Sequence, residues 1–349
     1  MTFKHPAVLL FGAGATRGGL AANAIPPPLD KDFFEVSAQI RNRGTPKLAH
    51  KVLKDVRDLY GRTVAVGLEE YYRDIEARAK IGSFATTANK PKDWLKRQKD
   101  LEALIRRVVL QTTCQEEQGH LTASASESHT AILERLKQDD SILTFNYDLV
   151  IEASLKNANM WNPRDGYGEE FHGVTGSWSK NWIEDRQIGN EQEPRSSRVQ
   201  LLKLHGSVNW TLYKNKLVRL KPRPLVVRTN RTSPVFDKIS ILPPGFDKKI
   251  DKNPYKKFWK TARLKMEKCN TIIIIGYSLP DADILAKALF AEVVRKRAAR
   301  KHFLRQLHLA DPSDSVKQKL TELFVPALNE KTMVFKYKDL SDFVSKIEN

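Results

Sequence analysis

Three polar residues that could contact a ligand or move a proton follow short apolar segments of the chain. Asn146 and Asp148 come just after Ser141–Phe145, and His205 comes directly after Leu201–Leu204. Ligand-facing side chains collect at strand ends in parallel sheets, and an imidazole with an ordinary pKa of about 6.5 suits proton transfer at neutral pH. A structural role stays open for each, because Asn146 and Asp148 are good helix caps and a lone histidine is more often structural. The three are candidate catalytic residues.

A glycine-rich turn closes the first apolar segment, Ala7–Phe11. The turn has the sequence Gly12-Ala13-Gly14-Ala15-Thr16, of which Gly12, Gly14, Ala15 and Thr16 are candidate ligand contacts. Glycines at a strand-to-helix turn let the backbone approach a pyrophosphate, whose charge the helix N-terminus then holds. The dinucleotide fingerprint of dehydrogenases has a further glycine where this chain has Arg17, which disfavours that class of enzyme.

A second glycine turn follows Thr271–Ile275, which contains four consecutive isoleucines. Such a β-branched run fits a strand covered on both faces. Gly276 and Ser278 come next and are candidate contacts to a phosphate or a ribose. The residues after them need no function, because proline and acidic side chains are preferred where helices begin; these are Pro280, Asp281 and Asp283.

These motifs require a sheet that brings several strand ends to one edge. Apolar runs alternate with helical patterns along most of the chain, which predicts an α/β protein with a Rossmann-like, doubly wound parallel sheet. Residues 30–138 have charged, helical periodicity instead, so we expect an inserted helical module there and a sheet domain formed by residues 1–29 and 139–349. Further predicted elements are a loop over 161–197, a hairpin over 208–219, helices over 254–268, 281–297 and 314–324, and a strand over 302–309.

Composition limits the classes of protein. The chain has 349 residues and a formal net charge of +18, which suits a polyanionic partner such as nucleic acid, a phosphate-rich ligand or a basic assembly interface. No apolar run approaches the roughly 18 residues of a membrane helix, and the N-terminus does not resemble a signal peptide, so we expect a cytoplasmic protein without membrane contact. The two cysteines, Cys114 and Cys269, exclude a four-cysteine zinc site.

Taken in order, the motifs resemble the sirtuin superfamily, and particularly the bacterial sirtuin-like domains that act as effectors in antiphage defence. The resemblance rests on the first glycine turn, Thr144-Phe-Asn146-Tyr-Asp148, Leu204-His205-Gly206-Ser207 and Gly276-Tyr-Ser278-Leu-Pro280-Asp281. It spans about residues 7 to 312, without the helical module and the 160–200 region. Deacylase sirtuins also carry four zinc-binding cysteines and a Pro-Asp-Phe-Arg stretch, and this chain has neither.

The resemblance implies that NAD lies across the carboxyl ends of the strands as the substrate, without zinc. Gly12, Gly14, Ala15 and Thr16 would hold the pyrophosphate, and Gly276 and Ser278 would contact the adenosine side. Asn146 would orient the attacking water or bind the nicotinamide ribose, Asp148 would accept from the nicotinamide amide, and His205 would be the general base. Asp311, at the end of a later strand, could accept from a ribose hydroxyl or cap a helix.

The implied activity is NAD hydrolysis that releases nicotinamide and ADP-ribose, as in an abortive-infection effector. An uncontrolled NAD hydrolase would deplete its own cell, so the resemblance further implies a homo-oligomer and a separate activator, such as a hexameric DNA-translocating ATPase or an Argonaute-like protein. Two alternatives stay open. One is a nucleic-acid-binding or nuclease subunit, favoured by the charge, and the other is a catalytically silent NAD-binding scaffold.

Overall fold

A computed structural model describes residues 2–41, 44–61, 66–81, 91–117, 120–162, 165–168, 174–175, 196–213, 216–220, 239–242, 255–281 and 283–348. Its centre is a six-stranded parallel sheet in the order β12-β11-β10-β1-β4-β6. The strands are β1 (Ala7–Phe11), β4 (Ser141–Thr144), β6 (Gln200–Lys203), β10 (Thr271–Ile275), β11 (Gln306–Ala310) and β12 (Met333–Tyr337).

The sheet is doubly wound, and its strand order reverses between β1 and β10. From β1 the chain proceeds outward through β4 and β6, then returns to place β10 on the other side of β1 and continues outward to β12. The two central strands pair in register from Ala7 with Thr271 to Phe11 with Ile275. Ligands of such sheets bind outside the carboxyl ends of the strands at this reversal. The predicted Rossmann-like α/β fold is confirmed.

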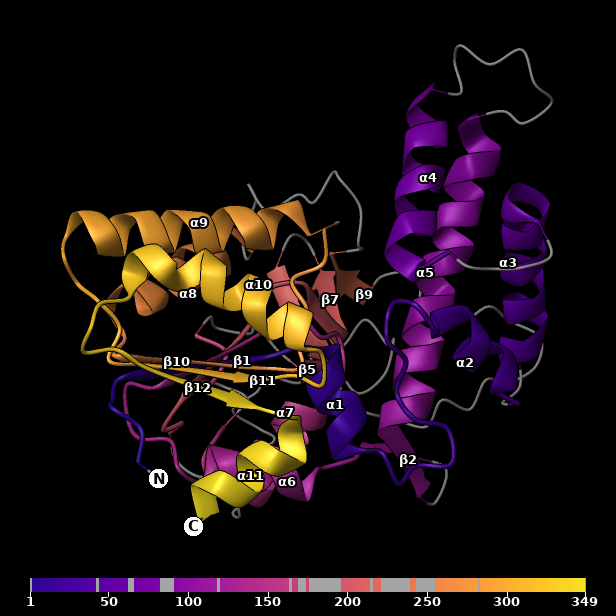
Figure 1. Cartoon of the computed structure of the whole chain (residues 1–349). Helices are drawn as coiled ribbons and strands as arrows, with labels where there is room; N and C mark the ends of the chain where they lie inside the picture. The colour runs from indigo at the N-terminus through magenta and orange to yellow at the C-terminus, as the bar shows by residue number, and fades with distance from the viewer. Residues whose placement is uncertain are drawn as a thin grey trace.

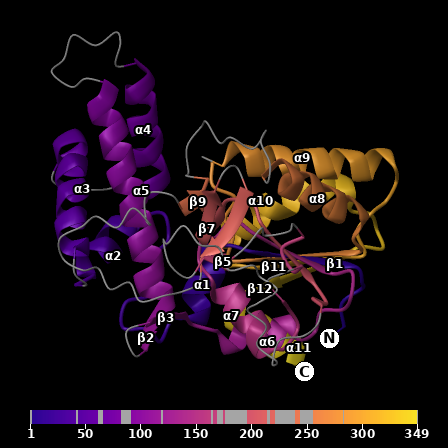
Figure 2. The same ribbon diagram turned by 180° about the vertical axis from the view of Figure 1, so that it is seen from behind.

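Helices cover both faces of the sheet (Figures 1 and 2). One face carries α8 (Tyr255–Lys268), α9 (Ile284–Ala299) and α10 (Asp314–Phe324). The other carries α1 (Ala13–Gly19), α6 (Glu127–Leu133), α7 (Val150–Asn157) and α11 (Leu340–Glu348). Because both faces are covered, every residue of β1 and β10 is buried, which explains their uninterrupted apolar sequences.

The predicted helical module contains α2 (Phe33–Gln39), α3 (Thr45–Tyr60), α4 (Leu68–Ile81) and α5 (Pro91–Thr113), which stand beside the sheet in Figure 1. Their apolar faces form a hydrophobic cluster separate from that of the sheet. Ile132, Leu133 and Leu136, which the predicted boundary assigns to this module, pack in the core of the sheet instead. A short hairpin of β2 (Cys114–Glu117) and β3 (His120–Ala123), which the sequence did not predict, lies between the two parts of the chain.

A smaller sheet is formed by strands on both sides of β6 in the sequence. It contains β5 (Val174–Thr175), β7 (Gly206–Tyr213), β8 (Lys216–Leu220) and β9 (Ile239–Ile241). β7 and β8 are antiparallel, as the predicted hairpin requires. Most of the segment predicted as a loop over 161–197 lies outside the described residues.

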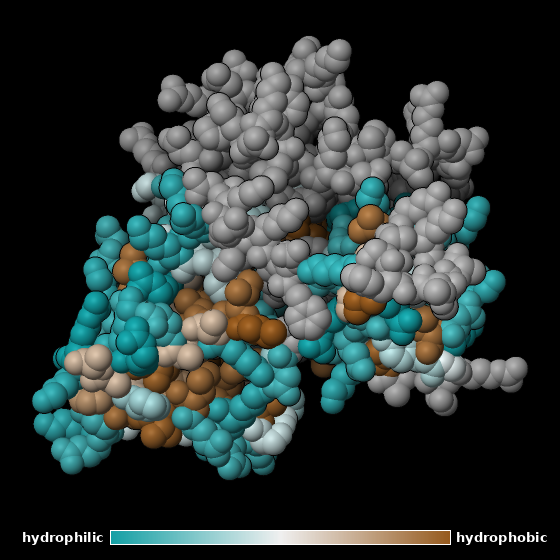
Figure 3. All heavy atoms as spheres, turned by 90° about the horizontal axis from the view of Figure 1, so that it is seen from above, coloured by the Kyte–Doolittle hydropathy of each residue, from teal (hydrophilic) through white to brown (hydrophobic). Residues whose placement is uncertain are grey.

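Several predicted elements differ from the structure. The helix expected from residue 281 begins at Ile284 as α9, because Asp283 is its N-cap and accepts a hydrogen bond from the amide of Ala286. The spacing of Ile284, Ala288 and Ala291 predicts that they form one stripe of this helix. All three are exposed, and the opposite side of α9 packs on the sheet. Figure 3 shows apolar side chains among hydrophilic ones on the face that carries α8, α9 and α10. The strand expected from residue 302 begins only at Gln306, and β12 and α11 were not predicted.

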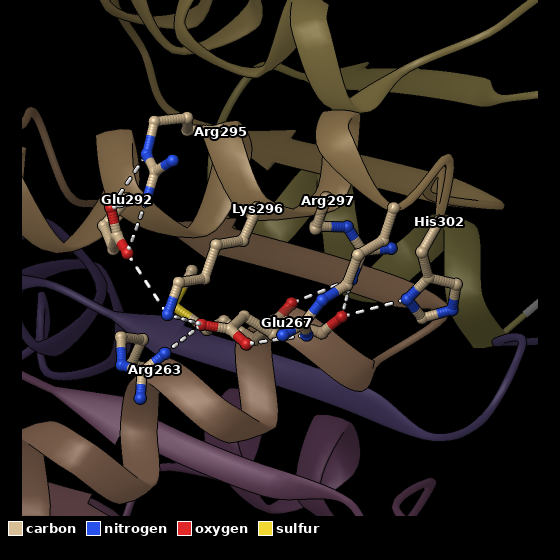
Figure 4. A network of polar contacts seen from close by, with 9 residues as sticks. Arg263, Glu267, Glu292, Arg295, Lys296, Arg297 and His302 are labelled. Carbon is tan, nitrogen blue, oxygen red and sulfur yellow. Dashed lines mark hydrogen bonds and ion pairs between the residues drawn. The ribbon is translucent and has the colours of Figure 1, made fainter.

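Basic side chains of α8 and α9 are partly neutralised where the two helices meet (Figure 4). Glu267 lies at the centre of this contact, and its carboxylate pairs with Arg263, Lys296 and Arg300. Arg297 is fully buried and donates from Nη1 to the backbone carbonyls of Met266, at 2.8 Å, and Glu267, at 3.0 Å. Part of the charge that the sequence suggested for a partner surface therefore holds the C-terminal end of α8 against α9.

Candidate active site

The two glycine turns interlock at the reversal point of the sheet. The amide of Gly12 donates to the carbonyl of Ile275, and the amide of Gly14 donates to the carbonyl of Gly276, both at 2.9 Å. Gly276 has a φ of +59°, and a Cβ there would lie 2.1 Å from the backbone nitrogen of Ala15. Glycine is therefore required for the close approach of the two turns. The amides of Gly12 and Gly14 are already donated, and that of Ala15 donates to the carbonyl of Gly12 at 3.0 Å.

Beside this contact, Thr16, Asn146 and Asp148 form a buried chain of hydrogen bonds. Asn146 Nδ2 donates to Thr16 Oγ1, and Thr16 Oγ1 donates to Asp148 Oδ2, each at 3.0 Å. A carboxylate only accepts, so the threonine proton points to Asp148 and the threonine lone pairs face the asparagine amide. The polarity of the chain therefore fixes the flip of the Asn146 amide and directs its Oδ1 away from Thr16.

Asp148 has a second contact, because its Oδ1 accepts from the amide of Val150 at 3.0 Å at the start of α7. Leu149 is the N-cap of α7, so one oxygen of Asp148 accepts from the first amide of the helix without being its N-cap, while the other oxygen belongs to the hydrogen-bond chain with Thr16. A buried ion pair stabilises this turn. Lys203 Nζ lies 2.9 Å from Glu152 Oε1 and also donates to the backbone carbonyl of Asp148. Burial raises the pKa of Glu152, and Lys203 opposes that effect.

His205 lies two residues beyond the end of β6 and is 7% exposed. Its ring lies among aromatic side chains, with centroid distances of 4.9 Å to Phe145, 6.2 Å to Trp259 and 6.3 Å to Tyr147. Its backbone carbonyl accepts from the amide of Leu242 at 2.7 Å, which anchors it to the residue after β9. The imidazole is therefore held by packing on several sides, as a proton-transfer group requires.

Asp283 lies beside the imidazole of His205, with 3.6 Å between Asp283 Oδ2 and His205 Nε2. The same oxygen accepts from the hydroxyl of Tyr277 at 2.9 Å. Burial raises the pKa of Tyr277 well above its ordinary value, and the Asp283 carboxylate raises it further. The phenol therefore stays protonated and donates. Sequence reasoning assigned Asp283 to a helix start alone. It does cap α9, but its contact with His205 joins residues 78 positions apart (283 − 205), and no local pattern indicates such a contact.

The remaining predicted residues lie at the same edge of the sheet. Ser278 is exposed just beyond β10. Asp311 is half-buried beyond β11, where its Oδ1 accepts from the amide of Ser313 at 2.9 Å, and burial raises its pKa. Arg17, where dehydrogenases have a glycine, pairs with Asp32 and so ties α1 to the start of α2.

Metal ligation finds no support in the part of the chain that the structure describes, where no group of three or more His, Cys, Asp or Glu residues could hold an ion. Burial raises the pKa of both Cys114 and Cys269 to about 12, so neither thiol is a ready nucleophile. None of the described helices is long and apolar enough to span a membrane.

Comparison with known proteins gives a family and a set of distant structural neighbours. The model of the SIR2-like domain matches residues 140–328. A Sir2 homologue in complex with NAD is similar at 14% identity with a TM-score of 0.43, covering 98% of this chain and 90% of that chain. A mutant Sir2 homologue in complex with ADP ribose is similar at 15% identity with a TM-score of 0.42, covering 98% and 91%. No curated protein matches the chain.

Proposed function

The chain belongs to the SIR2-like domain family, and on that premise we propose that it is an NAD hydrolase that releases nicotinamide and ADP-ribose. The observation that carries the proposal is the buried chain of Thr16, Asn146 and Asp148 at the reversal point of the sheet. His205 follows β6, which is separated from β1 in the sheet by β4, and it lies at the same edge of the sheet. These groups offer an oriented amide, a carboxylate and an imidazole where nucleotides bind in doubly wound sheets.

The reaction needs little covalent help from the protein. The bond between ribose and nicotinamide breaks with its electron pair leaving on nicotinamide, water adds its oxygen to the ribosyl carbon, and one proton is lost. In our proposal His205 accepts that proton, and the free Oδ1 of Asn146 orients the water or a ribose hydroxyl. Asp148, held by Thr16 and Lys203, accepts from the nicotinamide amide. The glycine turns allow the close backbone approach that a pyrophosphate requires.

Incubation of the purified chain with NAD tests the proposal, with nicotinamide and ADP-ribose quantified by chromatography. We expect His205→Ala and Asn146→Ala each to lower turnover about 10²–10⁴-fold while the protein remains folded by circular dichroism. His50→Ala, at an exposed position of α3, is the matched control and should retain full turnover. Wild-type rates in both site variants would refute the assignment.

We further propose that the enzyme is an antiphage effector, works as a cytoplasmic homo-oligomer and is activated by a separate protein, because unregulated NAD hydrolysis would deplete the cell. The net charge of +18 supports attraction to DNA or to a DNA-bound activator. Such attraction should weaken steeply with salt. Light scattering at low and high salt, with and without DNA, tests the formation of oligomers and the attraction to DNA. A monomer that does not bind DNA at low salt would contradict both expectations.

A further inference from the structure

We propose that Asp283 is a positioning residue for His205. Its carboxylate orients the imidazole and stabilises the imidazolium that forms when His205 accepts a proton. The catalytic half of this inference rests on the proposed function, in which His205 is the base. The pairing itself rests on the geometry alone.

The two oxygens of Asp283 have separate partners. Oδ1 accepts from the amide of Ala286 at 3.4 Å and caps α9, whereas Oδ2 accepts from Tyr277 and lies 3.6 Å from His205 Nε2. Helix capping alone would not require the second oxygen to be buried against an imidazole. Asp283 is 3% exposed, so its charge is hardly screened by water.

The surroundings make this charge effective. The described ring neighbours of His205 are Phe145, Tyr147 and Trp259, which reduce the local polarity and strengthen a Coulomb interaction across a few ångströms. Tyr147 is titratable, but burial raises its pKa well above its ordinary value, so it stays neutral.

Other ionisable groups, on neighbouring elements, affect the tyrosines that lie beside His205 and Asp283. Glu69 of α4, Tyr255 of α8 and Glu102 of α5 each raise the pKa of Tyr147, with Glu102 the weakest of the three, and Glu69 also raises the pKa of Tyr277. Lys203, on the strand before His205, is paired with Glu152. Glu69 is therefore the second carboxylate whose effect on His205 must be separated from that of Asp283.

A carboxylate beside Nε2 favours the tautomer with the proton on that nitrogen, and the acceptor lone pair of the ring is then on Nδ1. When a water molecule or a ribose hydroxyl transfers its proton to Nδ1, the positive charge forms opposite Asp283. The hydrogen bond from Tyr277 keeps the carboxylate in place during this transfer. Tyr277 is thus the second member of the positioning group.

The test is Asp283→Asn in the full-length protein. Asparagine has the same shape and is as good an N-cap as aspartate, but its single oxygen can accept from Ala286 or from Tyr277 and not from both. The variant therefore removes the charge and one acceptor, and Tyr277→Phe measures the loss of the tyrosine hydrogen bond separately. The matched control is Asp281→Asn. Asp281 is exposed two residues away and pairs with Lys287 and Lys319.

The first measurement is the pKa of His205 by NMR titration of the labelled protein without substrate, with its signal assigned from His205→Gln. We expect Asp283→Asn to lower this pKa by about one unit or more, and Asp281→Asn and Glu69→Gln to change it much less. Tyr277→Phe keeps the carboxylate, so the pKa should not fall. An unchanged pKa in Asp283→Asn would overturn the pairing, whether or not the protein cleaves NAD.

The second measurement is the pH profile of kcat/KM for NAD cleavage. We expect the acidic limb to move to lower pH in Asp283→Asn and kcat to fall about 10-fold to 10³-fold, with a smaller loss in Tyr277→Phe. A shifted pKa with an unchanged kcat would overturn the positioning role. Absence of cleavage by the wild-type protein would refute the proposed function instead, and the NMR titration would still decide the pairing.

Discussion

The hydrogen-bond chain at the reversal point can be tested by removing one hydroxyl group. Thr16→Val keeps the shape of the side chain but deletes the atom that joins Asn146 to Asp148. Both partners are then left buried, because Asn146 is 9% and Asp148 6% exposed. A neutral hydrogen bond contributes about 0.5–1.5 kcal/mol and one to a charged group about 1.5–3 kcal/mol, so the free energy of unfolding should fall by about 2–4.5 kcal/mol.

The matched variant is Thr16→Ser. It keeps the hydroxyl and loses one methyl group, which should lower the free energy of unfolding by about 1 kcal/mol. Activity should separate the two variants as well. In Thr16→Val the amide of Asn146 has lost the acceptor that fixes its orientation, so we expect kcat for NAD cleavage to fall about 10²-fold, with KM less affected. Thr16→Ser should stay within a few-fold of wild type.

The assays are urea unfolding monitored by tryptophan fluorescence and initial rates of nicotinamide release at saturating NAD. A double-mutant cycle with Asn146→Ala gives the coupling directly, since residues in one hydrogen-bond network are not additive. If Thr16→Val and Thr16→Ser had equal stability and equal kcat, the hydrogen bonds of Thr16 would have no role in fixing the orientation of the Asn146 amide.

Three further outcomes follow from the structure. Gly276→Ala should lower the melting temperature far more than Gly61→Ala, because both have positive φ but only a Cβ at Gly276 meets backbone atoms, whereas nothing lies within 4 Å of one at Gly61. The buried His129 and His308, whose pKa burial lowers to about 4, bind protons in the unfolded chain below about pH 6.5 but in the folded chain only below about pH 4. Unfolding free energy should therefore fall as pH decreases through that window, by up to about 3 kcal/mol for each, and urea midpoints for His308→Gln should show a weaker dependence. Elemental analysis should find no stoichiometric zinc, and zinc-restored activity after chelation would contradict this expectation.

The sequence predicted those parts of the fold that depend on local pattern. The run Thr271–Ile275 could only be a strand covered on both faces, and it forms β10. Arg297 shows the limit of such patterns. It contributes to the net charge of +18, which suited a polyanionic partner or a basic interface, yet it is fully buried, because its guanidinium reaches the last carbonyls of α8. Contacts of that kind depend on how helices pack, and the spacing of charges along one helix does not encode them.

The same distinction applies to the candidate site. Thr16, Asn146, Asp148 and His205 could be singled out because each follows a predicted strand, and their catalytic and binding roles remain predictions. Their contacts could not be predicted, since Asn146 and Thr16 are 130 positions apart in the chain. Asp283 was missed because a helix N-cap already explained an acidic residue before α9. A residue with two structural roles shows only the local one in its sequence.

The position of β10 has a consequence for synthesis of the chain on the ribosome. β10 lies between β1 and β11 in space, although about 260 residues separate β1 from it in the sequence. Until residue 275 has left the ribosome, one edge of β1 has no partner strand, and Ala7–Phe11 is an apolar segment of the type that aggregates when exposed. A nascent chain that ends before β10 also lacks Gly276 and Asp283, so the site assembles only after residue 283 has been made. Late insertion of the central strand would delay any activity of the site until synthesis has passed residue 283, and until then it leaves one edge of an apolar strand exposed.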